Sequence, residues 1–186
     1  MGIPTLIKTL TASDSASLAF VDGAASVTFD STYDEYMFVC TDIGPATDEA
    51  SFLFQVNATD DAGGGYDTSL ITSTFFRAYN HEDDSATAFE YVTADDLAQS
   101  SSFQKISHNI GNGADESAVC ILHIFSPSST TYVKHFYSRS HEYHAGNVAE
   151  QCFVAGYIND TTAIDEIQFK MSSGNFDGVI QMYGIA

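Results

Sequence analysis

The amino-acid sequence predicts an all-β protein, an antiparallel β-sandwich of jelly-roll type with at most one short helix. First, apolar side chains recur at every second position, as at Ile167, Phe169 and Met171, with polar residues between them. Second, turn-forming residues such as Asp22-Gly23 and Asn112-Gly113 interrupt these segments at fairly regular spacing. Third, no window of about eleven residues carries a helical stripe of apolar side chains. Short, evenly spaced strands favour two packed sheets.

The pattern predicts nine or ten strands along the chain. The segment 51–59 alternates in polarity and is expected to be half-buried, with one face in water. Residues 36–40 and 118–122 are apolar on both faces, which is typical of central strands covered on both sides or of strands at a subunit interface. The expected strands cover residues 6–11, 17–21, 25–29, 36–40, 51–59, 118–122, 131–138, 152–158, 166–171 and 179–185.

The segments between these strands are expected to be loops of a single domain that covers residues 1–186. Residues 93–106 begin with a possible helix cap at Thr93, but the serines at 100–102 limit any helix to one or two turns. We expect a surface loop or a wide hairpin tip at 60–67 and the longest irregular connection at 80–116. Long loops on a rigid sandwich are where binding usually takes place.

The charge balance excludes several kinds of partner. Among 186 residues, six Lys and Arg face 25 Asp and Glu, so the net charge is −19 with neutral histidines. Nucleic acid and anionic membrane surfaces are therefore not expected as partners, because both carry negative charge. The apolar fraction of 44% and the aromatic fraction of 13% are too high for a disordered acidic chain.

No group of residues indicates a catalytic, cofactor-binding or metal site. In His141-Glu142-Tyr143-His144 the histidines are three apart in a strand or loop context, whereas the zinc-protease motif needs them four apart on a helix. We interpret this segment as a polar loop at a strand end. His123 and His135 lie in neighbouring strand candidates, but no nucleophile elbow accompanies them, and core or interface packing is favoured for His123. The sequence thus predicts a protein that is not an enzyme.

Acidic loops and cysteines are explained in the same structural way. His81-Glu82-Asp83-Asp84 and Asp60-Asp61 could supply oxygen ligands to calcium, but neither follows a calcium-loop register, so solvated loops are favoured. The cysteines Cys40, Cys120 and Cys152 all lie within apolar runs and lack paired spacing. We expect buried thiols rather than disulfides or zinc ligands, and no cofactor.

Aromatic residues are more numerous than one small core requires. The chain has ten Tyr and 14 Phe, and clusters occur at 75–79 and 135–139, each with an arginine. Tyr and Arg are enriched at the centres of protein interfaces. The alternative to an interface role is that the Phe side chains fill the core of the sandwich and the Tyr side chains cover its ends. We favour self-association, which also covers sheet surfaces that would otherwise aggregate.

Several segments together resemble small virion structural proteins of tailed bacteriophages, especially those that infect aquatic bacteria and cyanobacteria. These segments are residues 6–13, 20–23, 30–36, 169–176 and 180–185. The resemblance is one of strands and turns, and it transfers no functional residue.

The resemblance implies an exterior component of the virion that is assembled in the host cytoplasm. The expected role is that of a capsid decoration or cement protein, which forms homo-oligomers, with a trimer preferred by analogy, and bridges other virion proteins. The alternative is a tail-tip or fibre module that recognises a glycan on the host surface.

Overall fold

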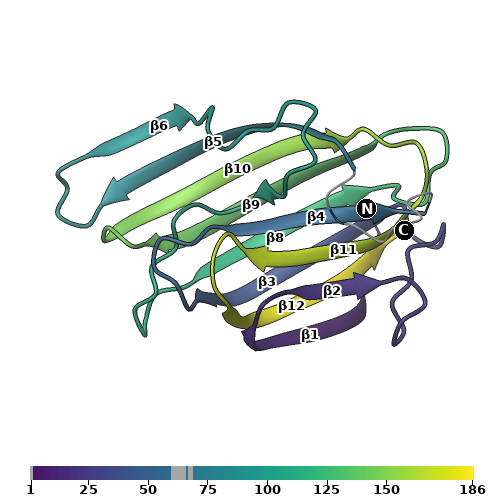
Figure 1. The fold of residues 1–186 in the computed structure, drawn as a ribbon, viewed down its shortest axis with the longest axis horizontal. Coiled ribbons are helices and arrows are strands. Elements are labelled where there is room, and N and C mark those ends of the chain that lie inside the picture. Colours follow the sequence, from purple (N-terminus) through teal and green to yellow (C-terminus); the bar gives the residue numbers. More distant parts are fainter. Residues whose placement is uncertain (1, 60–65, 67–68) are drawn as a thin grey trace.

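The fold is an antiparallel β-sandwich, which confirms the all-β prediction (Figure 1). The computed structural model describes residues 2–59, 66 and 69–186, and these residues contain no helix. The large sheet has eight strands in the order β1 (Thr5–Ser15), β12 (Phe176–Ile185), β3 (Glu35–Pro45), β8 (Ala118–Phe125), β9 (Lys134–His144), β10 (Val148–Ile158), β5 (Ile71–His81) and β6 (Thr87–Tyr91). The small sheet has four, in the order β2 (Leu18–Val21), β11 (Ile164–Met171), β4 (Phe52–Ala58) and β7 (Gln104–Lys105). The specific jelly-roll connectivity stays a prediction.

The core between the two sheets is built largely from phenylalanine. Because side chains alternate along β11, Phe169 points inward while Gln168 and Lys170 point away from the large sheet. The Phe169 ring contacts Phe38 of the large sheet at a centroid distance of 5.5 Å and Phe52 of the small sheet at 5.7 Å. Aromatic pairs in this range add to the stabilisation from buried area, so Phe169 ties the two sheets together.

A continuous register joins β9, β10 and β5. β9 and β10 pair without interruption from His144↔Val148 to Lys134↔Ile158, and β10 pairs with β5 from Val148↔His81 to Ile158↔Ile71. Residues 145–147 form the short β9–β10 turn, in which Asn147 has a φ of 57°. Asn tolerates this left-handed conformation better than most residues, so the turn sets the register of the hairpin.

The predicted strands differ from the structure in several places, and β5 lies at 71–81, where the sequence pattern predicts no strand. Residues 25–29 form no strand, because Ala25 and Ser26 have φ values of 47° and 75°, which turn the chain out of an extended conformation. The alternation of this segment instead reflects a loop that buries Val27 and Phe29. The strand expected at 131–138 begins only at Lys134 and runs on to His144.

The prediction of a wet face on β4 is wrong, because all seven residues of the strand are buried. The outer side of β4 is covered by the segments around residues 69 and 101–102. Gln55 Nε2 donates to the carbonyl oxygens of Ser69 and Ser101, both at 3.1 Å. These contacts give the side-chain amide of Gln55 its hydrogen-bond partners, so a strand with alternating polar residues can be buried on both of its faces.

The connection expected to be irregular at 80–116 contains two further strands, β6 and β7. The short helix that the sequence allowed at 93–106 does not form, and this segment consists of turns and β7. The expected loop at 60–67, with the calcium candidate Asp60-Asp61, lies outside the described residues apart from Tyr66. Where the structure describes the chain, no helix is long and apolar enough to span a membrane.

Replacing Phe169 with alanine is expected to lower the free energy of unfolding by about 3–5 kcal/mol, because a buried phenylalanine is lost and a cavity remains. The control is Gln168→Ala, which changes a half-buried side chain on the other face of the same strand and should cost less than about 1 kcal/mol. Urea denaturation followed by circular dichroism measures both. Equal losses for the two variants would contradict the role assigned to Phe169.

Candidate functional site

The first candidate site is the outer face of the large sheet, defined as the face directed away from the small sheet. Strand alternation places every second side chain there, and the register aligns them in rows. One row of directly paired residues runs across six strands, from β3 to β6. It consists of Val39, Ile121, Arg139, Phe153, Phe76 and Tyr91. Apolar and aromatic groups therefore dominate the middle of a face that the small sheet does not cover.

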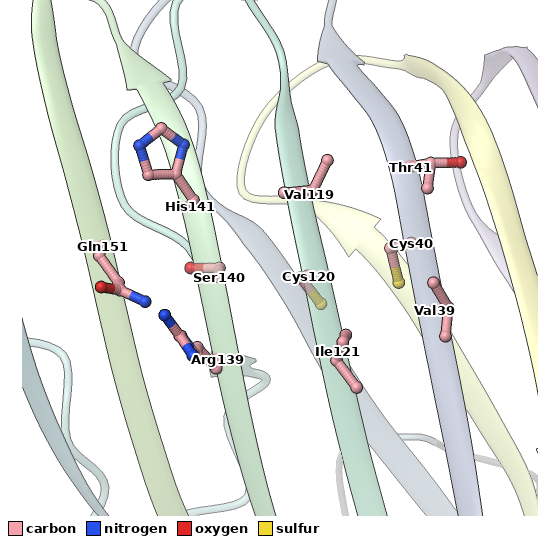
Figure 2. A pocket seen from close by; sticks show the side chains of 10 residues that line it. All are labelled: Val39, Cys40, Thr41, Val119, Cys120, Ile121, Arg139, Ser140, His141 and Gln151. Carbon is pink, nitrogen blue, oxygen red and sulfur yellow. The ribbon is translucent and has the colours of Figure 1, made fainter.

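A shallow hollow of about 420 Å³ lies on this face over β3, β8, β9 and β10 (Figure 2). Val39, Val119 and Ile121 form its apolar side. Arg139 and Gln151 point toward each other on the opposite side, with His141 beside them (Figure 2). Val119 and Ile121 remain 46% and 42% exposed, which is high for aliphatic residues on central strands.

Aromatic rings extend this exposed surface on both sides of the hollow. His123 stacks on Tyr137 with centroids 4.5 Å apart, and Phe153 stacks on Phe76 at 5.1 Å. Phe76 also contacts Phe89, which is 71% exposed. Alternation divides the aromatic clusters found in the sequence between the two faces of the sheet, so only part of each lies on the outer face.

The carboxylates of the β8, β9 and β10 strands all lie on one face of the sheet. Arg139 and His141 point outward from β9, whereas the carboxylates of β9 and β10, Glu142 and Glu150, are buried on the inner face. The β8, β9 and β10 strands, all of whose residues are described, therefore present no carboxylate outward. In a chain with a net charge of −19, this region lacks the negative charge carried elsewhere.

The second candidate site is a buried polar cluster on the inner face of the same strands. The register places Glu142 directly opposite Glu150, Ser140 opposite Cys152, and Cys152 opposite Arg77 of β5. Each of these residues occupies a position where alternation would place an apolar side chain. Burial without partners would be unfavourable, so their contacts to one another decide whether the cluster is stable.

Arg77 is the central cation of this cluster. Its Nη1 donates to both carboxylate oxygens of Glu150 at 3.2 Å and lies 2.8 Å from His108 Nδ1, while Nη2 lies 2.7 Å from Glu90 Oε1. Burial alone would lower the pKa of Arg77, but the bonds to Glu90 and Glu150 outweigh it and raise this pKa. Burial likewise opposes ionisation of Glu150, yet His108 and Arg77 hold its pKa below the ordinary value.

Glu142 and Cys152 form the deepest part of the cluster. The backbone N–H of His108 and the Cys152 thiol donate to Glu142 Oε1 at 2.8 and 2.9 Å, and Ser140 Oγ donates to Oε2 at 2.9 Å. Despite these donors, burial raises the pKa of Glu142 to about 8. Burial and the neighbouring Glu142 raise the pKa of the Cys152 thiol, so no reactive thiolate is indicated.

Two histidines flank the cluster at its more exposed end. Asn109 O accepts the backbone N–H of Ala145, and Ile110 bridges to His144, so the loop that carries His108 is fastened to the end of β9. His108 Nδ1 lies 3.1 Å from Glu150 Oε1, and the two imidazole centroids are 5.8 Å apart. Burial lowers the pKa of His144, which favours the neutral ring. His108, His144 and Glu150 together are a group that could hold a metal ion.

The structure separates residues that the sequence considered together. The segment 141–144 is the end of β9 rather than a loop, so His141 points outward while Glu142 and His144 point inward. His123 lies on the outer face and contacts Glu35, and His135 is exposed on the neighbouring strand. The segment 81–84 forms the turn between β5 and β6. All three cysteines are buried and free, as predicted.

The sequence pattern singles out neither His108 nor Glu150, and it draws attention to Glu142 and Arg77 only within the segments 141–144 and 75–79, without the buried cluster that they form. A signal was present, because Ser138, Ser140 and Glu142 follow Phe136 at the inward positions of β9. Polar residues at the positions of a strand whose side chains point into the core indicate a buried polar network. His108 carries no such signal, since a tertiary contact places it there.

Comparison with family models, with curated proteins and with solved structures finds no match for this chain.

Replacing Arg77 with methionine is expected to reduce the free energy of unfolding by about 3 kcal/mol, because Glu150 would remain buried without its cation. The matched control is Arg139→Met on the outer face, where the guanidinium lies 5.7 Å from the Phe153 ring centroid and its loss should cost about 1 kcal/mol or less. Urea denaturation at pH 7 measures the free energy of unfolding of both variants. A smaller effect at Arg77 than at Arg139 would refute the role given to the buried cluster.

Proposed function

We propose that this protein is a non-enzymatic structural protein whose copies associate through the outer face of the large sheet. The observation that carries the proposal is the uncovered row of Val39, Ile121 and aromatic side chains on the central strands. Exposed apolar surfaces of this extent are typical of interaction sites, whereas scattered exposed apolar residues are not.

The size of the face fits a stable pair. Eight strands spaced about 4.8 Å apart and about 30 Å long present an area of roughly 1,000 Å². A typical stable complex buries about 800 Å² on each partner. An overlap of about four-fifths of two such faces therefore reaches the area that specific association needs.

The charge distribution favours a second copy as the occupant. Most of the chain carries carboxylates, so two copies repel each other in most orientations. The outward side of β8–β10 lacks carboxylates and carries Arg139 and His141. Two copies that meet through this face bury their apolar side chains and keep the acidic surfaces apart.

The more specific form of the proposal is an exterior virion component, most simply a capsid decoration or cement protein that oligomerises and bridges neighbouring subunits. It is supported by the resemblance of the strand and turn segments to bacteriophage virion proteins and by the acidic surface, which keeps an exterior protein soluble. Quantitative mass spectrometry of purified particles tests it. A decoration protein should be present in hundreds of copies, a tail protein in a handful, and absence from particles would refute the virion role.

Replacing Val39 with glutamate is expected to weaken self-association by about 100-fold, because each partner would bury a carboxylate whose directly paired neighbours, Ile121 and Gln181, carry no positive charge. Gln168→Glu adds the same charge to the outward side of β11 in the small sheet and serves as the control. Analytical ultracentrifugation over a concentration series measures the dissociation constants and the stoichiometry, including the trimer expected by analogy.

Circular dichroism should give the same spectrum for both variants and for the wild-type protein. Monomeric wild-type protein at all concentrations, or equal weakening by the two substitutions, would disprove association through the outer face.

Glycan recognition is the second candidate function, favoured by the polar side of the hollow. Arg139, His141 and Gln151 line the hollow, and Tyr137, which is 45% exposed, lies on the same face of β9 two residues before Arg139. Sugars stack on such rings and bond to neighbouring polar groups. Strong signals on a glycan array that are lost in Tyr137→Ala would favour this function over pure assembly.

A further inference from the structure

We propose that His108, His144 and Glu150 bind a divalent transition-metal ion, with zinc the best match. Their ligand atoms, two imidazole nitrogens and a carboxylate oxygen, all lie within 4.8 Å of one another. Two imidazoles and one carboxylate form a set that zinc commonly uses, with a water molecule as the fourth ligand. The proposal is independent of assembly through the outer face and revises the expectation that the chain has no metal ligand.

The framework that positions these ligands is rigid. His144 and Glu150 belong to the two strands of one hairpin, at the end where a turn of three residues joins them. His108 is brought to the same place because its loop bonds to the β9 end at Asn109 and Ile110. Ligands held by a sheet and a fastened loop need little rearrangement to converge on an ion.

Asp95 supplies a second observation that points to a metal. His108 Nε2, the ring nitrogen on the far side from Glu150, faces Asp95 Oδ2 at 3.5 Å. This carboxylate oxygen is buried and has no hydrogen-bond partner among the described residues. A carboxylate behind the far nitrogen of a histidine is the arrangement that orients metal-binding imidazoles.

An entry path to the site is also present. A pocket of about 190 Å³ is lined by His144 and Glu150 together with Arg77, Gly146 and Val148. It gives an ion and its water ligand access to two of the three ligands. His144 Nδ1 accepts the backbone N–H of Gly146 at 3.0 Å, so metal binding at this ring costs that one hydrogen bond.

Arg77 now provides the positive charge that the metal would provide. Its Nη1 contacts both His108 Nδ1 and Glu150, the atoms assigned to the ion. Its Nε and Nη2 bond separately to Glu90 at 2.8 and 2.7 Å. The guanidinium can therefore give up the Nη1 contacts and stay anchored at Glu90 when an ion enters.

The experiment uses chelator-treated full-length protein titrated with zinc chloride in a calorimeter. We expect one equivalent to bind, and His144→Ala to weaken binding by at least about 100-fold. His141→Ala is the matched control, because this histidine lies on the same strand but on the outer face. The affinity of this variant for zinc should equal that of the wild-type protein. Asp95→Asn should weaken binding by about 10- to 100-fold through the orientation of His108.

Cobalt identifies the ligands, since Glu142, Glu150 and Cys152 form a second group that shares Glu150. The proposed nitrogen and oxygen ligands predict visible d–d bands without a thiolate charge-transfer band. Absence of stoichiometric binding, equal affinity of His144→Ala and His141→Ala, or a thiolate band that is lost in Cys152→Ser would overturn the assignment.

Zinc should also restore thermal stability to Arg77→Met, because the ion replaces the missing positive charge beside Glu150. The expected result is a larger zinc-induced rise in midpoint temperature for this variant than for the wild-type protein. A variant that folds but shows no rise with zinc would count against the site.

Discussion

The structure depends above all on the continuous antiparallel register that joins β9, β10 and β5. A strand side chain changes face at every residue, so a slip of one position would move Glu142 and Glu150 to the outer face and place Arg139 and His141 in the core. The β9–β10 turn with Asn147 in a left-handed conformation sets this register. Both candidate sites are consequences of it, since they occupy opposite faces of β9, β10 and the strands beside them.

The two faces of the large sheet carry opposite kinds of unusual residue. On the inner face, carboxylates lie where phenylalanine and isoleucine would be expected, and Arg77, Ser140 and His108 provide the partners that make their burial tolerable. On the outer face, Val39, Val119 and Ile121 lie where polar residues would be expected, and no element among the described residues covers them. Buried charge and exposed apolar surface are both unfavourable for an isolated domain, which is why each indicates a function.

Sequence reasoning located most strands because a half-buried strand leaves a period of two in the sequence. It failed where a tertiary contact changed the meaning of that pattern. The alternation of polar and apolar residues predicts that Gln55 faces solvent, yet the loops around Ser69 and Ser101 cover it. Ala25 and Ser26 belong to a segment that alternates like a strand, but their backbone is left-handed. The cluster around Glu150 joins four separate segments, and no local sequence pattern predicts contacts between segments that lie far apart in the chain.

The sequence by itself determined the all-β class, the position of most strands, the burial of the three cysteines and the excess of aromatic residues over the needs of one core. These properties follow from local alternation and from composition. The tertiary structure alone decided which strands are neighbours, which face each histidine occupies and that His108 lies beside Glu150. The physical reason is that pairing between distant strands depends on register and on loop contacts, which connect residues far apart in the chain.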